Sequence, residues 1–180
     1  DLPVTSRLHG IQSWLALPLT LEEMEPSFTH YAADALPELD VGGCRVRLIM
    51  GAAFGRASPV ATYSPTLYLE VRMPRGASFA LPAEASERAA YVVSGAVLVG
   101  GREHRDGVLA VARAGATPSL TAVEDSRVMV IGGEPVGARQ IWWNFVSSSQ
   151  ERIERAKRDW ASGRIGKVAG DDEFIPLPER

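Results

Sequence analysis

The feature that most constrains the fold is a run of residues in which apolar and polar side chains alternate. In residues 66–73 (TLYLEVRM), one face carries Leu67, Leu69, Val71 and Met73. The opposite face carries Thr66, Tyr68, Glu70 and Arg72. A period of two is the repeat of a β-strand with one face in the core. The sequence therefore predicts a half-buried strand here.

Further short strand-like runs surround this one, with turn residues between them. We expect them at residues 45–50, 77–81, 89–93, 96–99, 108–112, 119–123 and 127–131. Many short strands separated by turn signals are typical of a sandwich or barrel. Residues 9–18 (HGIQSWLALP) are apolar on both faces, which predicts a strand buried on both sides.

The C-terminal part has a helical pattern instead. Ser148 and Glu151 fit a capping box, and Ile153 and Trp160 recur at helical spacing. We expect the tryptophan pair at 142–143 to pack this helix against a sheet. The tail from residue 170 contains two prolines and is expected to be extended.

Composition excludes several function classes. The chain has 180 residues, enough for one domain with a core, and a formal net charge of −3, which argues against direct contact with nucleic acid through phosphate neutralisation. No apolar run approaches the ~20 residues that span a bilayer, so no membrane partner is expected. Cys44 is the single cysteine, which fits a reducing compartment and a cytoplasmic location.

The glycines at 76 and 95 stand at the spacing of the first metal-binding motif of cupins, which is Gly, five residues, His-x-His, three or four residues, Glu, six residues, Gly. The two histidine positions hold Pro82 and Glu84, and the glutamate position holds Arg88. The segment resembles a cupin motif without its ligands.

The second cupin motif, Gly, five residues, Pro-x-Gly, two residues, His, can be placed on Gly107, Arg113, Gly115 and Pro118. Its histidine position therefore holds proline. The resemblance to the two motifs implies an all-β fold, a cupin-type (RmlC-like jelly roll) β-barrel, and no metal site in this chain. With the helical pattern and the proline-containing end described above, we expect the barrel to be followed by a C-terminal α-helix and an extended tail.

Three further segments carry a more specific resemblance. Residues 131–135 (IGGEP), 142–149 (WWNFVSSS) and 170–179 (GDDEFIPLPE) resemble the end of bacterial pirin-family proteins. Residues 9–12 (HGIQ), with Trp14 and Leu17-Pro18, resemble the run that links the two barrels of that family.

The resemblance implies a bicupin whose N-terminal barrel binds iron or another divalent metal through three histidines and a glutamate. That barrel is absent here, so no metal or catalytic residue is carried over and no cofactor is expected in this chain. We expect residues 1–40 to be a linking strand and connector from the missing barrel, 41–146 to be the C-terminal cupin barrel, and 147–180 to be the helix and tail. The expected partner is the N-terminal barrel of the same protein.

The resemblance implies two functions for the whole protein. One is a metal-dependent oxygenase of the quercetin 2,3-dioxygenase type, in which this domain does no chemistry itself. The alternative is a regulatory or interaction module, such as a transcription cofactor or enzyme regulator, with a protein partner and no catalysis.

Among the residues themselves, the positions that face the former metal pocket are the candidates for a site: Pro82, Glu84, Arg88 and Pro118. Arg88 with Glu84 could bind a small acid or carbohydrate, since a guanidinium pairs well with carboxylates. The alternative is an internal ion pair, or side chains in water at the barrel mouth. The serines at 147–149 are interpreted as a helix cap, and His104 as part of a solvated, charged turn.

Overall fold

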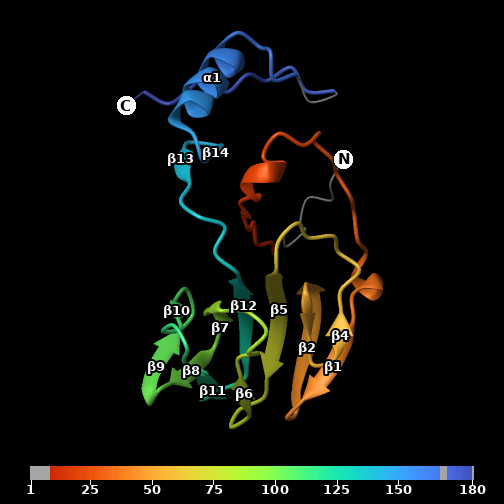
Figure 1. The fold of residues 1–180 in the computed structure, drawn as a ribbon. Helices are drawn as coiled ribbons and strands as arrows, with labels where there is room; N and C mark the ends of the chain where they lie inside the picture. The colour runs from red at the N-terminus through yellow and green to blue at the C-terminus, as the bar shows by residue number, and fades with distance from the viewer. Residues whose placement is uncertain (1–8, 167–169, 180) are drawn as a thin grey trace. The chain divides into compact units, whose positions relative to one another are not determined.

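A computed structural model describes residues 9–166 and 170–179 of the chain (Figure 1). The chain forms two compact units, one of residues 23–136 and one that joins residues up to 22 with residues from 137 onward. Each unit is described separately below. Among the described residues, no helix is long and apolar enough to cross a membrane.

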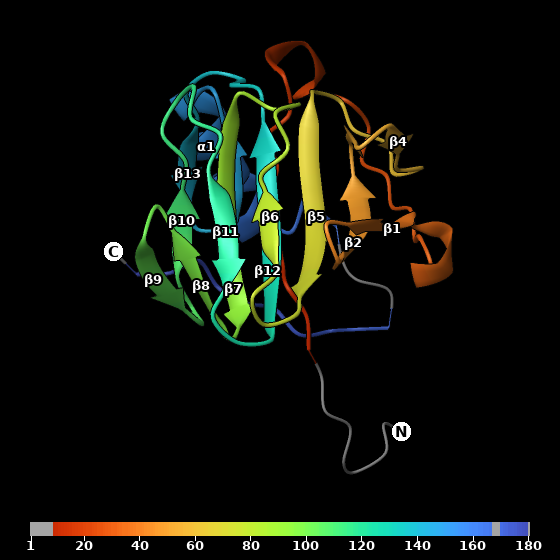
Figure 2. The same ribbon diagram turned by 90° about the horizontal axis from the view of Figure 1, so that it is seen from below.

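The unit of residues 23–136 is built from two antiparallel sheets, seen one in front of the other in Figure 2. A short 3₁₀ helix, η2 (Ala33–Ala35), precedes the first strand. The six-stranded sheet has the order β1 (Glu38–Val41), β2 (Cys44–Met50), β5 (Thr66–Met73), β12 (Ser126–Gly133), β7 (Glu87–Ser94) and β10 (Leu109–Val111). The four-stranded sheet has the order β6 (Ser78–Ala80), β11 (Ser119–Ala122), β8 (Ala96–Val99) and β9 (Arg102–Arg105). A small hairpin, β3 (Ala52–Ala53) and β4 (Arg56–Ala57), follows β2.

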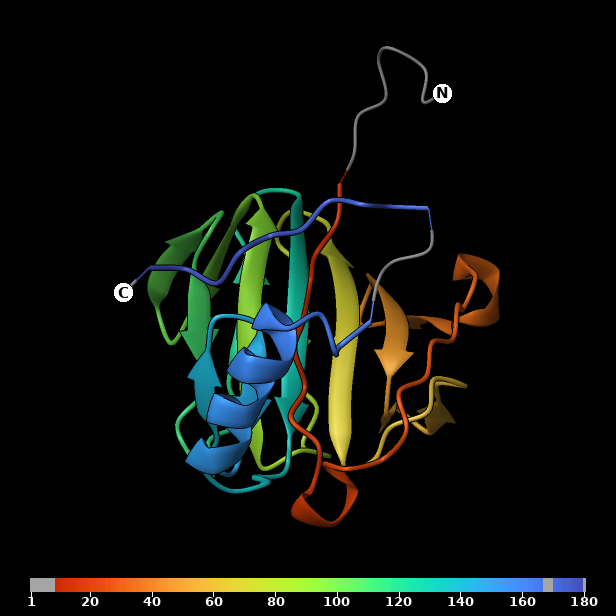
Figure 3. The ribbon, with the colours of Figure 1, turned by 90° about the horizontal axis from the view of Figure 1, so that it is seen from above.

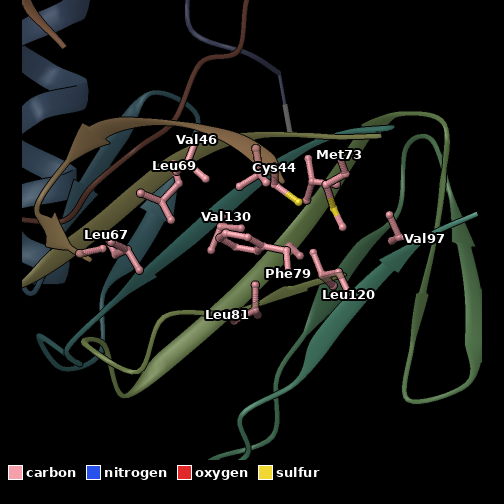
Figure 4. Close-up of a cluster of buried hydrophobic side chains, with 14 of the residues drawn as sticks. Cys44, Val46, Leu67, Leu69, Met73, Phe79, Leu81, Val97, Leu120 and Val130 are labelled. Carbon is pink, nitrogen blue, oxygen red and sulfur yellow. The ribbon is translucent and has the colours of Figure 1, made fainter. Parts of the chain in front are cut away.

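The core of this unit lies between the two sheets. Leu67, Leu69, Val71 and Met73 of β5 are at most 2% exposed, as their alternation predicts. Figure 4 shows inward side chains of both sheets meeting, among them Phe79 from the smaller sheet. Burial of such side chains stabilises the fold by roughly 1.5–3 kcal/mol each. The predicted all-β cupin-type fold with a C-terminal helix is confirmed.

The outer face of β5 differs from the simple alternation. Glu70 is only 4% exposed, because its carboxylate is surrounded by arginines of three strands. Its Oε1 contacts Arg72 Nε at 2.9 Å and Arg127 Nε at 2.8 Å, and its Oε2 lies 3.6 Å from Arg47. Burial raises the pKa of Glu70, but the hydrogen bond from Arg72 and the three positive charges outweigh it, so the pKa lies below its ordinary value.

The glycine frame of the cupin motif has a steric cause. Gly76 and Gly95 both have positive φ, of 80° and 87°. A Cβ on Gly95 would lie 2.5 Å from Ser126 Oγ and 2.6 Å from the Asp125 carbonyl oxygen. Only glycine allows β7 and β8 to turn so close to the start of β12.

Two predictions about the strands are wrong. Residues 9–18 are extended but are in no strand, and Trp14 is 51% exposed. Apolar character alone does not make a strand, which needs a hydrogen-bonding neighbour. Residues 1–8, which the predicted linking segment also includes, lie outside the described residues. His104 is in a strand rather than a turn, since β9 pairs with β8 as a charged edge strand.

The second unit contains the 3₁₀ helix η1 (Leu19–Leu21), the hairpin β13 (Gln140–Trp142) and β14 (Phe145–Ser147), and helix α1 (Gln150–Ala161), drawn in light blue in Figure 3. Trp143 of the hairpin turn packs edge-to-face on Trp160 of α1, with ring centroids 5.1 Å apart. The tryptophan pair thus packs the helix on a hairpin. Residues 171–179 are in no helix or strand, as predicted for the tail.

The serines before α1 do not form the predicted capping box. The N-cap is Ser149, and its side chain makes no capping hydrogen bond. The Ser148 hydroxyl instead donates to Glu22 Oε2 at 2.7 Å, and Arg139 Nε approaches Glu22 Oε1 at 2.7 Å. Ser148 and Arg139 hold the pKa of Glu22 below its ordinary value. Ser148 therefore binds a carboxylate 126 residues away in the sequence and does not cap the helix.

Replacement of Gly95 by alanine tests the close approach between strands. We expect Gly95→Ala to lower the free energy of unfolding by about 2 kcal/mol or more, since the backbone must shift as well as accept a strained φ. Gly101→Ala is the matched control, because Gly101 has φ 80° but no atom near its Cβ position. Urea unfolding measures both. Equal losses in the two variants would contradict the steric argument.

Replacement of Glu70 by glutamine tests its ion pairs. Because the folded-state pKa is lowered, the charge stabilises the fold above the unfolded-state pKa, and this contribution is lost as pH falls through the folded-state pKa. We expect Glu70→Gln to cost about 1–2 kcal/mol at pH 7, and the difference from the unmodified chain to shrink in acid. Glu103→Gln, at an exposed ion pair, is the control and should cost little. A difference that is constant with pH would contradict this role.

Candidate functional site

The four former ligand positions lie around one end of the first unit. Pro82 and Glu84 are in the loop between β6 and β7, Arg88 is in β7, and Pro118 directly precedes β11. The two loops are joined by a hydrogen bond of 3.0 Å from the Leu81 amide to the Pro118 carbonyl. The structure therefore brings the two motifs together as the cupin frame predicts.

Arg88 is the central residue of this arrangement. Its side chain is on the same face of β7 as the core residues Ala90 and Val92, and only 6% of it is exposed. Its Nη1 donates to the Pro82 carbonyl at 3.0 Å, and its Nη2 donates to the Ala116 carbonyl at 2.5 Å. The guanidinium thus links the loop of the first motif to the loop of the second, where a cupin metal would link ligands from both.

Room for the Arg88 side chain comes from the neighbouring strand. Gly132 of β12 lies opposite Arg88 in the register, and a Cβ there would lie 2.7 Å from the Glu87 carbonyl oxygen and 3.2 Å from Arg88 Cγ. The glycine pair in residues 131–135 is the signal for this space, but nothing in the residue pattern connects it with Arg88.

Glu84 is separate from Arg88. Its Oε1 accepts a hydrogen bond from the Phe54 amide at 3.3 Å, and it lines a hollow of about 360 Å³ beside the β3–β4 hairpin. Among the described residues, Glu84 forms no ion pair with Arg88, so the expected internal ion pair is wrong. Glu84 is exposed, which agrees with the alternative of a side chain in water at the barrel mouth. The partners of Arg88 are backbone carbonyls, which residue types alone do not reveal.

Glu134 also holds the loop that contains Pro82 and Glu84. Its Oε1 accepts from the Ser86 amide at 2.9 Å and its Oε2 from the Ser86 hydroxyl at 2.8 Å. These hydrogen bonds hold the pKa of Glu134 below its ordinary value. The loop between β6 and β7 is therefore held at Pro82 by Arg88 and at Ser86 by Glu134.

The residues at the former ligand positions do not fit a metal. Proline side chains have no donor atom, and the guanidinium of Arg88 would repel a cation. Within residues 9–166 and 170–179, no group of three His, Cys, Asp or Glu side chains could hold a metal ion. Cys44 is buried, and burial raises the pKa of its thiol, which favours the unreactive neutral form.

The two facing sheets and the glycine frame define a cupin domain whose four former ligand positions hold a single possible metal donor, the carboxylate of Glu84. Residues 68–166 match the pirin C-terminal cupin domain. The chain belongs to the pirin family.

Known relatives extend this match over most of the chain. A pirin-like protein of Caulobacter vibrioides is 51% identical over 175 residues, which are 96% of this chain and 61% of that protein. Human pirin is 28% identical over 166 residues, or 88% of this chain and 57% of its own length. The chain thus spans little more than half the length of these relatives.

A solved structure agrees with the fold. The crystal structure of quercetin 2,3-dioxygenase from Acinetobacter baumannii superimposes with a TM-score of 0.77 at 25% identity, over 86% of this chain and 56% of that chain. The similarity therefore extends over more of the chain than the unit of residues 23–136 alone.

Replacement of Arg88 tests its bridging role. We expect Arg88→Met to lower the free energy of unfolding by about 2–3 kcal/mol, because two carbonyls lose their donor in a buried place. Arg113→Met, at an exposed position of the second motif, is the matched control and should change stability by less than about 0.5 kcal/mol. Chemical denaturation measures both. Similar stabilities of the two variants would contradict the bridge.

Proposed function

We propose that this chain is the metal-free C-terminal cupin domain of a pirin-family protein. The observation that carries the proposal is the position of Arg88, a buried cation at a former ligand position that donates to the carbonyls of Pro82 and Ala116. The positive charge of the Arg88 guanidinium would repel a metal cation at the same place. Proline at one histidine position of each motif, Pro82 in the first and Pro118 in the second, supports the same conclusion.

We further propose that the whole protein is a metal-dependent oxygenase of the quercetin 2,3-dioxygenase type. The similarity to the Acinetobacter baumannii enzyme supports this proposal. In it, iron or another divalent metal is bound by an N-terminal cupin barrel, and the present domain is a structural partner of that barrel.

The unit of residues up to 22 and from 137 onward offers apolar side chains for such a partner. Trp14 is 51% exposed, Leu15 51% and Ile141 68%. Exposed apolar groups of this size are typical of surfaces that another domain covers. We propose that they contact the metal-binding barrel of the same protein.

Metal titration tests the first proposal. We expect the 180-residue chain, incubated with Fe²⁺ under anaerobic conditions and then dialysed, to retain far less than one metal ion per chain by elemental analysis. A protein that also carries the proposed N-terminal barrel, treated in parallel, should retain one. Retention of one equivalent of iron by the 180-residue chain would refute the proposal that this domain is metal-free.

Oxygen uptake tests the second proposal separately. We expect the longer, iron-loaded protein to consume oxygen when given quercetin, and the 180-residue chain to consume none. The absence of turnover in the loaded longer protein would overturn the oxygenase assignment and leave the metal-free assignment of this domain intact. That outcome would favour the regulatory alternative.

A further inference from the structure

A row of three arginines crosses the outer face of the six-stranded sheet. Arg45 of β2 lies directly opposite Arg72 of β5, and Arg72 lies directly opposite Arg127 of β12. The residues next to them in each strand are buried, so the three guanidinium groups share the outer face. Arg72 and Arg127 have 53% and 35% of their side chains exposed.

Such a row is unfavourable without anions, because like charges on directly opposite residues of neighbouring strands repel. Glu70, two residues from Arg72 on the same face of β5, supplies one negative charge beside the row. It contacts the Nε atoms of Arg72 and Arg127, which leaves the terminal amino groups of both side chains for other acceptors. The Arg45 guanidinium pairs with no residue in the described part of the chain.

The arginines line an open groove of about 540 Å³. Two carboxylates, Asp40 and Asp125, line it as well, and each accepts a hydrogen bond from a backbone amide. Asp40 Oδ1 binds the Gly43 amide at 3.1 Å, and Asp125 Oδ1 binds the Arg75 amide at 2.9 Å. With Glu70, three carboxylates offset the charge of the three guanidinium groups, so the groove has no large positive excess. It suits one oxyanion group held by directed hydrogen bonds rather than a highly charged polyanion.

We propose that this groove binds a small molecule with a phosphate or carboxylate group, through Arg45, Arg72 and Arg127. The planar fork of a guanidinium donates two parallel hydrogen bonds to either group, and its positive charge strengthens them. The volume of the groove is within the range of small-molecule sites, roughly 300–1,000 Å³. The site is on the opposite face of the sheet from Arg88 and does not depend on the proposed oxygenase function.

Titration with simple anions tests the site. Inorganic phosphate and succinate are added separately to the isotopically labelled chain, at constant ionic strength, and amide chemical shifts are followed by NMR. We expect saturable shifts at Gly43, Ser94 and Ser126, which line the groove. The anion that binds more tightly identifies the phosphate or the carboxylate class. No saturable shift with either anion would overturn the proposal.

Charge-matched variants distinguish a site from general attraction. We expect Arg45→Gln to weaken binding roughly tenfold without a loss of stability, since this side chain has no partner among the described residues. Arg102→Gln on β9 of the other sheet makes the same change in net charge and should leave binding unchanged. Arg72→Lys keeps the charge but removes the fork, so we expect weaker binding. Equal weakening by Arg45→Gln and Arg102→Gln would overturn the proposal.

Discussion

The exclusion of water between the two sheets is the constraint on which the rest of the first unit depends. Inward side chains of both sheets, such as Leu69, Phe79 and Val130, fill this space. A charge can enter such a core only if hydrogen bonds replace its lost hydration. This requirement explains why Arg88 lies at the end of the apolar cluster, where the carbonyls of two loops are within reach of its guanidinium.

The same constraint shows what could be predicted from the sequence. The alternation in residues 66–73 reports directly which side chains face the core, and the structure follows it on the inner face of β5. The burial of Glu70 on the outer face could not be read in the same way. It depends on arginines of β2 and β12, whose register with β5 is a property of the assembled sheet.

Local patterns were misleading where a distant group supplied the hydrogen bond. Ser148 has the sequence context of a helix cap, yet its hydroxyl donates a hydrogen bond to the carboxylate of Glu22 instead. The apolar run at residues 9–18 has strand composition but no ladder partner. Similarly, the motif spacing placed Arg88 at the former metal position, while the identity of its acceptors required the folded loop that contains Ala116.

The six-stranded sheet holds a buried charge on each of its faces, and the two are stabilised differently. Arg88 on the inner face pairs with no carboxylate of the described residues and relies on carbonyl dipoles, which suit a cation at a fixed place and exclude a second one. Glu70 on the outer face relies on arginine side chains that are partly exposed to solvent. The inner arrangement therefore closes the former metal position, whereas the outer arrangement leaves guanidinium donors available. If this domain binds a small ligand, its charge distribution favours an anion on the outside of the barrel over a metal within it.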